Sequence, residues 1–467
     1  MPEATRIEKD SMGQMTVPAS ALWGASTQRA VENFPVSGYR FTRRFIRAMG
    51  LIKLCAAEAN ASFGTVPKAK TDLIAQAVQD VIEGKLDDHF VVDIFQTGSG
   101  TSTNMNANEV IAHRAGQINP NEKVHPNDHV NQSQSSNDVI PTAMHVSAAM
   151  ALKEDLIPAL EHLAKKLGEK AKAFDSIIKI GRTHLQDATP IRLGQEFSGY
   201  AAQATLGITR AQKAIKAIRE LPIGGTAVGT GINTPKGFGK AVADLLAKKT
   251  GIEFVESANH FEAQHAKDGF VEASGLVKTI AVSLTKIAND IRHLGSGPRC
   301  GIGELKLPAT QPGSSIMPGK VNPVMCEMLM QACAQMIGAD ATITQAAVTL
   351  GNFDLHVGMP VMAHNFLEGV RILANASRIF ADRCIAGLEA DVKRAESLVE
   401  QSLAMCTTLA PVIGYDNAAA LAKKAHETGK TIREMALEQK VVPADQLDKL
   451  LDPRDMTEPG AQMATSG

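Results

Sequence analysis

The chain has 467 residues, a formal net charge of −1 and a hydrophobic content of 44%. This length exceeds that of one typical domain, so we expect two or three domains. The near-neutral charge argues against a nucleic-acid partner. Aromatic residues make up only 4% of the chain, so aliphatic side chains must fill the core, which favours close helix–helix packing.

No apolar run approaches the length of a membrane-spanning helix, and residues 1–11 show no pattern of a signal or transit peptide. We therefore expect a cytoplasmic protein without a membrane partner; a mature organellar form with its leader removed would look the same. The six cysteines form no C-x-x-C pair, which is typical of reduced thiols and argues against an iron–sulfur centre.

The predicted first domain, residues 1–138, mixes turns rich in proline and glycine with helical stretches. We expect short strands around Ile7 and Met15–Val17, and helices over Phe45–Phe63 and Lys70–Gly84.

A polar, glycine-punctuated loop follows at Gln96–Asn106, before a helical stretch at Ala107–Ala115. Its hydroxyls and amides could hold a carboxylate at the helix N-terminus. By itself the segment could equally be an ordinary capped helix start.

The segment His125–Asp138 ends the first domain. Asp138 is predicted to cap a helix that has Pro141 in its first turn. His125 and Asp128 could pair, but His/Asp density without a further ligand motif predicts hydrogen bonding, so we expect no metal site here.

The predicted second domain, residues 139–395, has the pattern of long helices with short connections. The clearest is Phe270–Leu294, whose apolar residues alternate in steps of three and four, a seam for helix packing. Further helices are predicted at Leu156–Leu167, Leu193–Arg219, Pro323–Thr349 and Val357–Ala386. Five long helices predict a bundle, and a seam of roughly 37 Å predicts association between subunits.

The predicted third domain, residues 396–467, contains shorter helices around Ala418–Thr428 and Ile432–Gln439.

Gly181–Pro190 lies between two predicted helices and contains His184, the side chain best suited to titrate near neutral pH. A single loop histidine is more often structural, so this segment alone assigns no role.

The most informative segment is Gly313–Pro323, which holds two hydroxyls, a lysine and an asparagine between flexible glycines. Asn322 and Pro323 are predicted as the N-cap and first residue of a helix, whose N-terminus attracts anions. A bound carboxylate beside Ser314 points to removal of a proton from the adjacent carbon, with Lys320 and Asn322 stabilising the charge that develops. A hydroxyl is a poor base, so loop N–H groups or a cation would have to hold Ser314 as an alkoxide.

Residues 313–322 resemble the signature Gly-Ser-Ser-x-Met-Pro-x-Lys-x-Asn of the fumarase/aspartase superfamily. Further segments that resemble class II fumarases are 96–106, 125–138, 181–190 and 221–233. The resemblance implies a mainly α, three-domain fold whose central five-helix bundle assembles into the helical core of a homotetramer, with each active site shared between subunits. It also implies a lyase that reversibly adds water to fumarate to give L-malate, through proton abstraction and an aci-carboxylate intermediate, without a metal or organic cofactor.

The resemblance also implies the site residues. Ser314 removes the C3 proton of malate, and His184, oriented by Glu327, handles the water. The implied substrate contacts are Ser99, Gly100, Thr101, Ser135, Ser136, Asn137, Thr183, Ser315, Lys320, Val321 and Asn322. A second, non-catalytic dicarboxylate site is implied at His125, Pro126, Asn127 and Asp128.

Two kinds of alternative share the scaffold. Aspartate ammonia-lyase typically has Asn in place of His125, Gln in place of His184, and Cys-Gln-Ser-Thr-Asn where this chain has residues 133–137; all three differences favour a fumarase. Argininosuccinate and adenylosuccinate lyases share less of the chain outside the serine loop. A non-catalytic structural protein, such as the lens proteins of the superfamily, need not keep the catalytic set. That set is complete here, with Ser314, Lys320, Asn322, His184 and Glu327.

Overall fold

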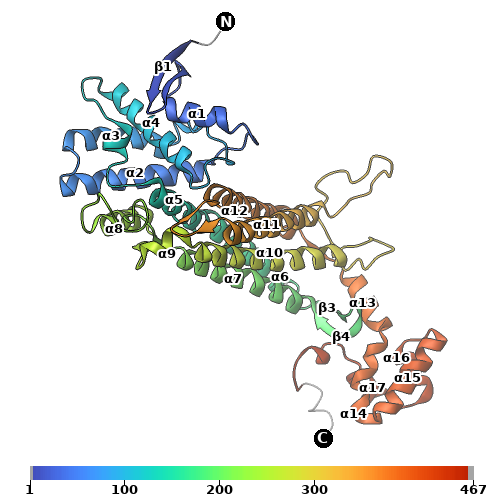
Figure 1. The fold of residues 1–467 in the computed structure, drawn as a ribbon. Helices are drawn as coiled ribbons and strands as arrows, with labels where there is room; N and C mark the ends of the chain where they lie inside the picture. Colours follow the sequence, from blue (N-terminus) through green and yellow to red (C-terminus); the bar gives the residue numbers. More distant parts are fainter. Residues whose placement is uncertain (1–3, 461–467) are drawn as a thin grey trace. The chain divides into compact units, whose positions relative to one another are not determined.

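The computed structural model describes residues 4–460 and is mainly α-helical, which confirms the predicted fold class (Figure 1). The outermost residues of the first and third predicted domains, 1–3 and 461–467, lie outside the described part. The chain divides into two compact units. Unit 1 takes its described residues from Met1–Pro158, Ile208–Ala281 and Ala332–Ala374, and unit 2 from Ala159–Gly207, Val282–Gln331 and Asn375–Gly467. The division into three consecutive domains stays a prediction.

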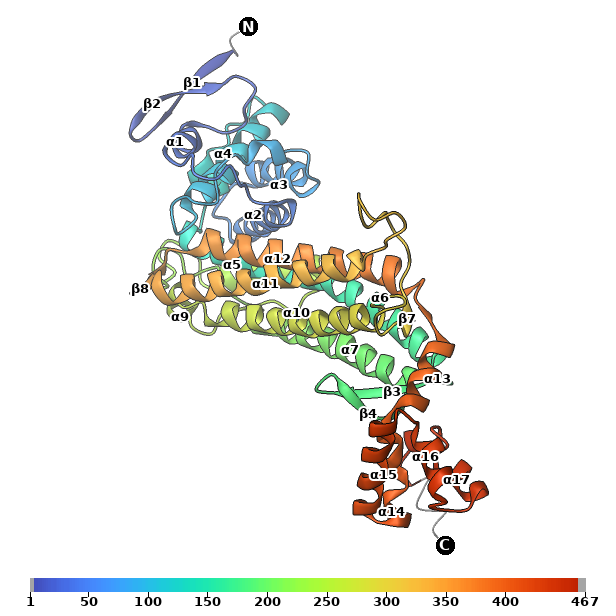
Figure 2. The ribbon, with the colours of Figure 1, turned by 90° about the vertical axis from the view of Figure 1, so that its right-hand side faces the viewer.

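Unit 1 begins with the two predicted strands. β1 (Thr5–Asp10) pairs antiparallel with β2 (Gly13–Pro18), so that Thr5 lies opposite Pro18. The helices that follow are α1 (Ala25–Asn33), α2 (Arg43–Phe63), α3 (Lys68–Ile82) and α4 (Thr101–Ile118). The short 3-10 helix η1 (Asp87–His89) lies between α3 and α4. α3 packs against both α2 and α4 (Figure 2).

The predicted helices at Phe45–Phe63 and Lys70–Gly84 are confirmed as α2 and α3 with small shifts of their ends. α2 ends where Gly64 adopts a left-handed conformation (φ 71°), which a residue with a Cβ rarely adopts. The helix predicted at Ala107–Ala115 begins six residues earlier, at Thr101, because Gly100 (φ 72°) turns the chain into the helix. Thr101 therefore lies in a helical first turn and not in a loop.

A set of long helices follows. They are α5 (Ser136–Ala151), α6 (Ile157–Ala173), α7 (Leu193–Ala217), α10 (Asp268–Leu294), α11 (Val324–Thr349) and α12 (Met359–Phe380). The π-helical turn η3 (Leu152–Leu156) links α5 to α6, and η4 (Ala381–Ile385) extends α12. α7, α10, α11 and α12 each contribute residues to both units.

The apolar seam predicted for α10 is confirmed, because its eight residues between Phe270 and Leu294 are all buried. Within unit 1, the Phe270 ring lies 4.9 Å from the ring of Phe366 on α12. The Ser274 hydroxyl donates to Asp340 on α11 at 2.8 Å. α10 therefore packs against α11 and α12 through the predicted face.

The rest of unit 1 consists of short elements. They are β5 (Glu220–Leu221), α8 (Phe238–Thr250), β6 (Val255–Glu256), α9 (His260–His265), β8 (Gly351–Asn352) and β9 (Leu355–His356). β5 pairs parallel with β6, and β8 antiparallel with β9. Among residues 4–460, no helix is long and apolar enough to cross a membrane.

Unit 2 contains a hairpin that the sequence did not lead us to expect: β3 (Ile178–Thr183) and β4 (Gln186–Arg192) replace a loop between two helices. A second strand pair joins β7 (Leu305–Lys306) to β10 (Glu389–Ala390). The C-terminal elements are α13 (Val392–Gln401), η5 (Leu403–Thr408), α14 (Ala410–Ile413), α15 (Tyr415–Thr428), α16 (Ile432–Gln439), α17 (Ala444–Leu450) and η6 (Asp455–Thr457). α15 and α16 confirm the two helices predicted there.

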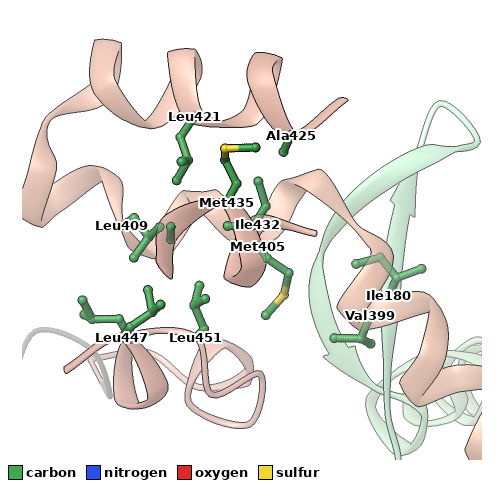
Figure 3. Close-up of a cluster of buried hydrophobic side chains, with 12 residues drawn as sticks. Ile180, Val399, Met405, Leu409, Leu421, Ala425, Ile432, Met435, Leu447 and Leu451 are labelled. Carbon is green, nitrogen blue, oxygen red and sulfur yellow. The ribbon is translucent and has the colours of Figure 1, made fainter. Parts of the chain in front are cut away.

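A cluster of buried aliphatic side chains holds this C-terminal part together (Figure 3). Met405, Leu421 and Met435 lie in it, and so does Ile180 of β3. At about 25 cal/mol per Å² of buried apolar surface, side chains of this size stabilise a fold by about 1.5–3 kcal/mol each. The cluster therefore fixes the base of the β3–β4 hairpin to the C-terminal helices.

Candidate functional site

The first polar segment lies at the N-terminus of α4 in unit 1. The Ser99 and Thr101 hydroxyls lie 2.8 Å apart and share a hydrogen bond. An added Cβ at Gly100 would lie 2.8 Å from the Ile140 side chain, so the start of α4 lies directly against the first turns of α5. The predicted substrate contacts in residues 99–101 and 135–137 therefore belong to neighbouring helix N-termini, the kind of place that binds carboxylates.

Position 98 requires glycine because the backbone just before α12 passes very close to it. An added Cβ would lie 1.9 Å from the Val357 carbonyl oxygen, far inside contact distance. We expect Gly98→Ala to lower the free energy of unfolding by about 1–3 kcal/mol, measured by chemical denaturation. The matched control is Gly116→Ala on α4, where an added Cβ meets nothing within 4 Å; it should be neutral or stabilise by about 0.5–1 kcal/mol. Equal effects of the two changes would contradict this interpretation.

The second polar segment begins α5. Ser135, and not Asp138, is the N-cap: its side chain accepts an N–H from Asn137, and the Asp138 carboxylate accepts the Ser135 N–H at 2.9 Å. The prediction that Asp138 caps this helix is therefore wrong, because a serine three residues before an acidic residue forms a capping box. Pro141 accordingly lies beyond the first turn.

Asp138 is fully buried and also accepts the N–H groups of Gly224 (3.0 Å) and Thr226 (2.9 Å). Burial raises the pKa of this carboxyl to about 6, against the opposing effect of the N–H groups. The carboxylate joins the glycine-rich segment at 221–233 to the start of α5. Asn137 extends the same junction, since its side chain donates to the Ala227 carbonyl at 2.8 Å.

The implied second dicarboxylate site lies on the short π-helix η2 (Pro126–Val130). His125 Nδ1 accepts the N–H groups of Asn127 (3.3 Å) and Asp128 (3.1 Å) and also lies 3.2 Å from Asp128 Oδ2. The His125 ring therefore caps the start of η2. The exposed Asp128 carboxylate adds negative charge here, which disfavours an anion.

In unit 2, His184 lies at the tip of the β3–β4 hairpin. Arg182 and Asp187, and Thr183 and Gln186, are opposite each other, so His184 and Leu185 form a two-residue turn. Both have positive φ (57° and 61°), which is uncommon for residues other than glycine, although histidine adopts it more readily than leucine. Side chains held in such a conformation are common at functional sites. The His184 side chain is exposed.

Buried charges hold the part of β3 that leads into the turn. Both terminal nitrogens of Arg182 donate to Glu304 at 3.0 Å, and Glu304 is completely buried. Lys179, also buried, places its ammonium 3.5 Å from the same carboxylate. The bidentate pair fixes the residue next to Thr183 and thereby the direction of the turn.

The third segment is the loop before α11. Ser314 Oγ accepts the N–H groups of Ile316 (3.3 Å) and Met317 (3.0 Å). These are the loop N–H donors that an alkoxide requires, since each favours the negatively charged oxygen. Gly319 (φ 80°) allows the loop to turn back before Lys320, and the Lys320 side chain is exposed.

Asn322 closes this loop, and its predicted role as helix N-cap is wrong. α11 begins at Val324, and the Pro323 carbonyl accepts the first helical hydrogen bonds, from Cys326 (3.0 Å) and Glu327 (3.2 Å). The Asn322 amide donates instead to the Gly313 carbonyl at 2.6 Å. An added Cβ at Gly313 would lie 2.5 Å from the Lys320 carbonyl, so this closure requires glycine.

Glu327 lies in the first turn of α11 and is partly exposed. Among residues 4–460, no ion pair is formed by Glu327, Lys320 or His184. The predicted partnership of His184 with Glu327 is therefore not made within the described chain. Ser315 and Val321 are exposed on the same loop.

The predicted site residues thus fall into two sets. Unit 1 holds Ser99, Gly100, Thr101, Ser135, Ser136 and Asn137, and unit 2 holds Thr183, His184, Ser314, Ser315, Lys320, Val321, Asn322 and Glu327. The sequence did not predict three residues that support these sets: Lys53, Arg182 and Glu304. For Lys53 a signal existed: it lies on the buried face of α2 with Met49 and Ala56, where a lysine is unusual.

Comparison with known proteins identifies the family of this chain. Residues 13–338 match the family described as lyase, and residues 405–458 match the fumarase C C-terminus. Fumarate hydratase class II 2 of Bradyrhizobium diazoefficiens is 50% identical over 462 residues, 98% of each chain. Fumarate hydratase class II of Halobacterium salinarum is 53% identical over 464 residues, also 98% of each chain.

The fold comparison gives the same family. The crystal structure of class II fumarase from Schistosoma mansoni superposes with a TM-score of 0.95 at 38% identity, covering 98% of this chain and 100% of that one. A fumarate lyase:delta crystallin structure from Brucella melitensis gives a TM-score of 0.93 at 43% identity, covering 98% and 100%. The chain therefore belongs to the lyase family and, within it, to the class II fumarate hydratases.

Proposed function

We propose that this protein is a fumarate hydratase, which reversibly hydrates fumarate to L-malate. The observation that carries the proposal is the Ser314 loop, in which two N–H groups donate to one serine oxygen. Lys320 lies on the same loop and Glu327 on the helix that follows. The names and near-complete alignment of the relatives support the same reaction.

In the dehydration direction Ser314, as an alkoxide, takes the C3 proton of malate. The electrons of the C3–H bond move into the neighbouring carboxylate, giving an aci-carboxylate whose charge Lys320, Asn322 and Thr183 stabilise. When the electrons return to form the double bond, the C2–O bond breaks, and His184 protonates the leaving hydroxide to give water. Glu327 orients His184 and favours its charged form. Ser315 and Val321, on the same loop as Ser314, are the remaining proposed substrate contacts in this part of the site.

The other carboxylate binds at the two helix N-termini of unit 1. Their free N–H groups and partial positive charge favour an anion. The contacts are made by Ser99, Gly100, Thr101, Ser135, Ser136 and Asn137. The second dicarboxylate site at residues 125–128 stays a prediction, and the exposed carboxylate of Asp128 predicts that it binds more weakly than the first.

A homotetramer with active sites shared between subunits completes the proposal. Beyond Glu327, the exposed face of α11 carries no charged residue: Ala334, Ile337, Gly338, Ala341, Gln345 and Val348 lie on it. Between Met328 and Thr349 the one charged residue is Asp340, which is buried. An uncharged, partly apolar face of this length suits contact with another copy. The cytoplasm stays the expected location.

The experiment is ultraviolet absorbance of the purified full chain after treatment with a chelator, at a wavelength where the conjugated product absorbs. L-Malate should cause a rise and L-aspartate should not. A rise with aspartate alone would assign the chain to the ammonia-lyases, and no rise with either substrate would overturn the proposal.

A further inference from the structure

Lys53 is a fully buried lysine in unit 1. It lies on α2, and its neighbours on the buried face, Met49, Ile52 and Ala56, are apolar. A buried ammonium is costly unless hydrogen bonds compensate for the lost water. An apolar residue would fill the same space at less cost, so the lysine needs an explanation other than packing.

The contacts of Lys53 are all directed at one stretch of chain. Its ammonium donates to Asn131 Oδ1 and to Gln134 Oε1, both at 3.0 Å. Asn131 and Gln134 lie immediately before the N-cap of α5. Within residues 4–460, no carboxylate lies within ion-pair distance of this ammonium.

The same network reaches a predicted substrate contact. Asn131 Oδ1 also accepts the side-chain N–H groups of Asn104 (3.0 Å) and Asn108 (3.2 Å) on α4. Asn104 donates in addition to the Ser136 hydroxyl at 3.2 Å. The Lys53 ammonium is thus connected to Ser136 through Asn131 and Asn104, and α2, α4 and α5 meet at this point.

A second tether from α2 acts on the same stretch. The Asn60 amide donates to the Gln132 carbonyl at 2.9 Å, and its oxygen accepts the Ser133 hydroxyl at 2.8 Å. Ser133 has a positive φ of 62°. The backbone before α5 is therefore held in an unusual conformation by two side chains of α2, Lys53 and Asn60, which lie about two helical turns apart.

We propose that Lys53 is a positioning residue: its buried ammonium holds residues 131–134 and, through Asn131 and Asn104, orients Ser136 for the substrate carboxylate. The inference deepens the proposed function and rests on it, since it assumes that residues 135–137 bind a dicarboxylate. Burial lowers the pKa of Lys53 to about 7, while buried Asp138 opposes this shift.

The test compares Lys53→Met with Lys68→Met, a change of an exposed lysine on α3 that pairs with Asp72. Hydrogen–deuterium exchange should rise in residues 129–140 of Lys53→Met and stay unchanged in the control. Residues 135–137 hold the carboxylate that takes up no charge, so its binding is uniform along the reaction. KM for L-malate should therefore rise about tenfold while kcat changes less than about threefold. Unchanged exchange together with unchanged KM would overturn the inference.

If Lys53→Met does not fold, Asn131→Ala is the alternative test. It removes the hydrogen bonds from Lys53 and Asn104 to the Asn131 side chain, while Lys53 keeps its hydrogen bond to Gln134. It should raise KM about tenfold as well, and an unchanged KM would contradict the inference. Calorimetric titration with succinate, a saturated analogue of fumarate, separates the two hypotheses. A wild-type chain that neither binds succinate nor turns over malate refutes the proposed function, while the exchange comparison still decides whether Lys53 positions the segment.

Discussion

Ser314→Ala should reduce kcat for malate dehydration by about 10³-fold, because the variant lacks the base that removes the C3 proton. In the parent protein the N–H groups of Ile316 and Met317 donate to the serine oxygen and favour an alkoxide. The methyl group of alanine can neither accept these hydrogen bonds nor take up a proton. KM should change little, since malate keeps its contacts with both carboxylates. Steady-state kinetics with L-malate and with fumarate measure the effect in both directions.

The matched control is Thr310→Ala, which removes an exposed hydroxyl four residues earlier in the chain. Its kcat should stay within about twofold of the parent. A Ser314→Ala variant that retains more than a tenth of the parental kcat would show that another group takes the proton. The roles assigned to Lys320 and Asn322 would then have to be reconsidered as well.

Arg182→Met should lower the free energy of unfolding by about 3 kcal/mol. The change leaves the buried Glu304 carboxylate with Lys179 at 3.5 Å as its remaining cationic partner, and breaking a buried pair from one side typically costs about 3–5 kcal/mol. It should also reduce kcat by about tenfold or more, because the turn that carries His184 loses its anchor and small displacements of a catalytic group are expensive. Chemical denaturation and steady-state kinetics give the two values.

Two further variants separate a broken pair from a general effect of losing arginine. Arg219→Met removes a partner of the exposed Glu253, and exposed pairs contribute about 0–1 kcal/mol. The double variant Arg182→Met/Glu304→Gln removes the stranded charge and should recover part of the lost stability. A loss below 1 kcal/mol for Arg182→Met, or no recovery in the double variant, would contradict the anchoring role of this pair.

The helices were predictable because their signal is local and repeated. The three-and-four spacing of apolar residues between Phe270 and Leu294 predicted α10 and its buried face. The β3–β4 hairpin lacks such a signal: its turn is His184–Leu185, where two-residue hairpin turns usually carry asparagine and glycine. The hairpin forms because tertiary contacts, Ile180 in the C-terminal cluster and Arg182 on Glu304, hold β3 in place.

Helix starts were harder to predict than helices, for a related reason. Asp138 resembles an N-cap in sequence, but Ser135 three residues earlier completes a capping box with it. Gly100 is the N-cap of α4 and adopts a left-handed conformation. Because glycine has no side chain, no capping motif in the sequence marks this helix start. Asn322 supports its own loop through the Gly313 carbonyl, a contact between residues nine apart that periodicity cannot reveal.

The candidate site was predicted as a set of residues, while its supporting groups were not. Motif resemblance selects the side chains that we propose as substrate contacts, such as Ser314 and His184. Lys53 and Glu304 act through burial and long-range pairing, which appear only when separated segments are placed together. The predicted pairing of His184 with Glu327 is not made within residues 4–460 and stays part of the proposal of shared active sites.

The most direct measurement of the central claim is proton and deuterium NMR of the product formed from fumarate in D₂O by the chelator-treated full chain. Addition of water by one positioned base delivers a single deuteron to one face of C3, so the account predicts L-malate with one deuterium at C3 as a single diastereomer, and the Ser314→Ala variant should form none at a comparable rate. Malate with deuterium scrambled over both C3 positions, or fumarate that stays unchanged under these conditions, would contradict it.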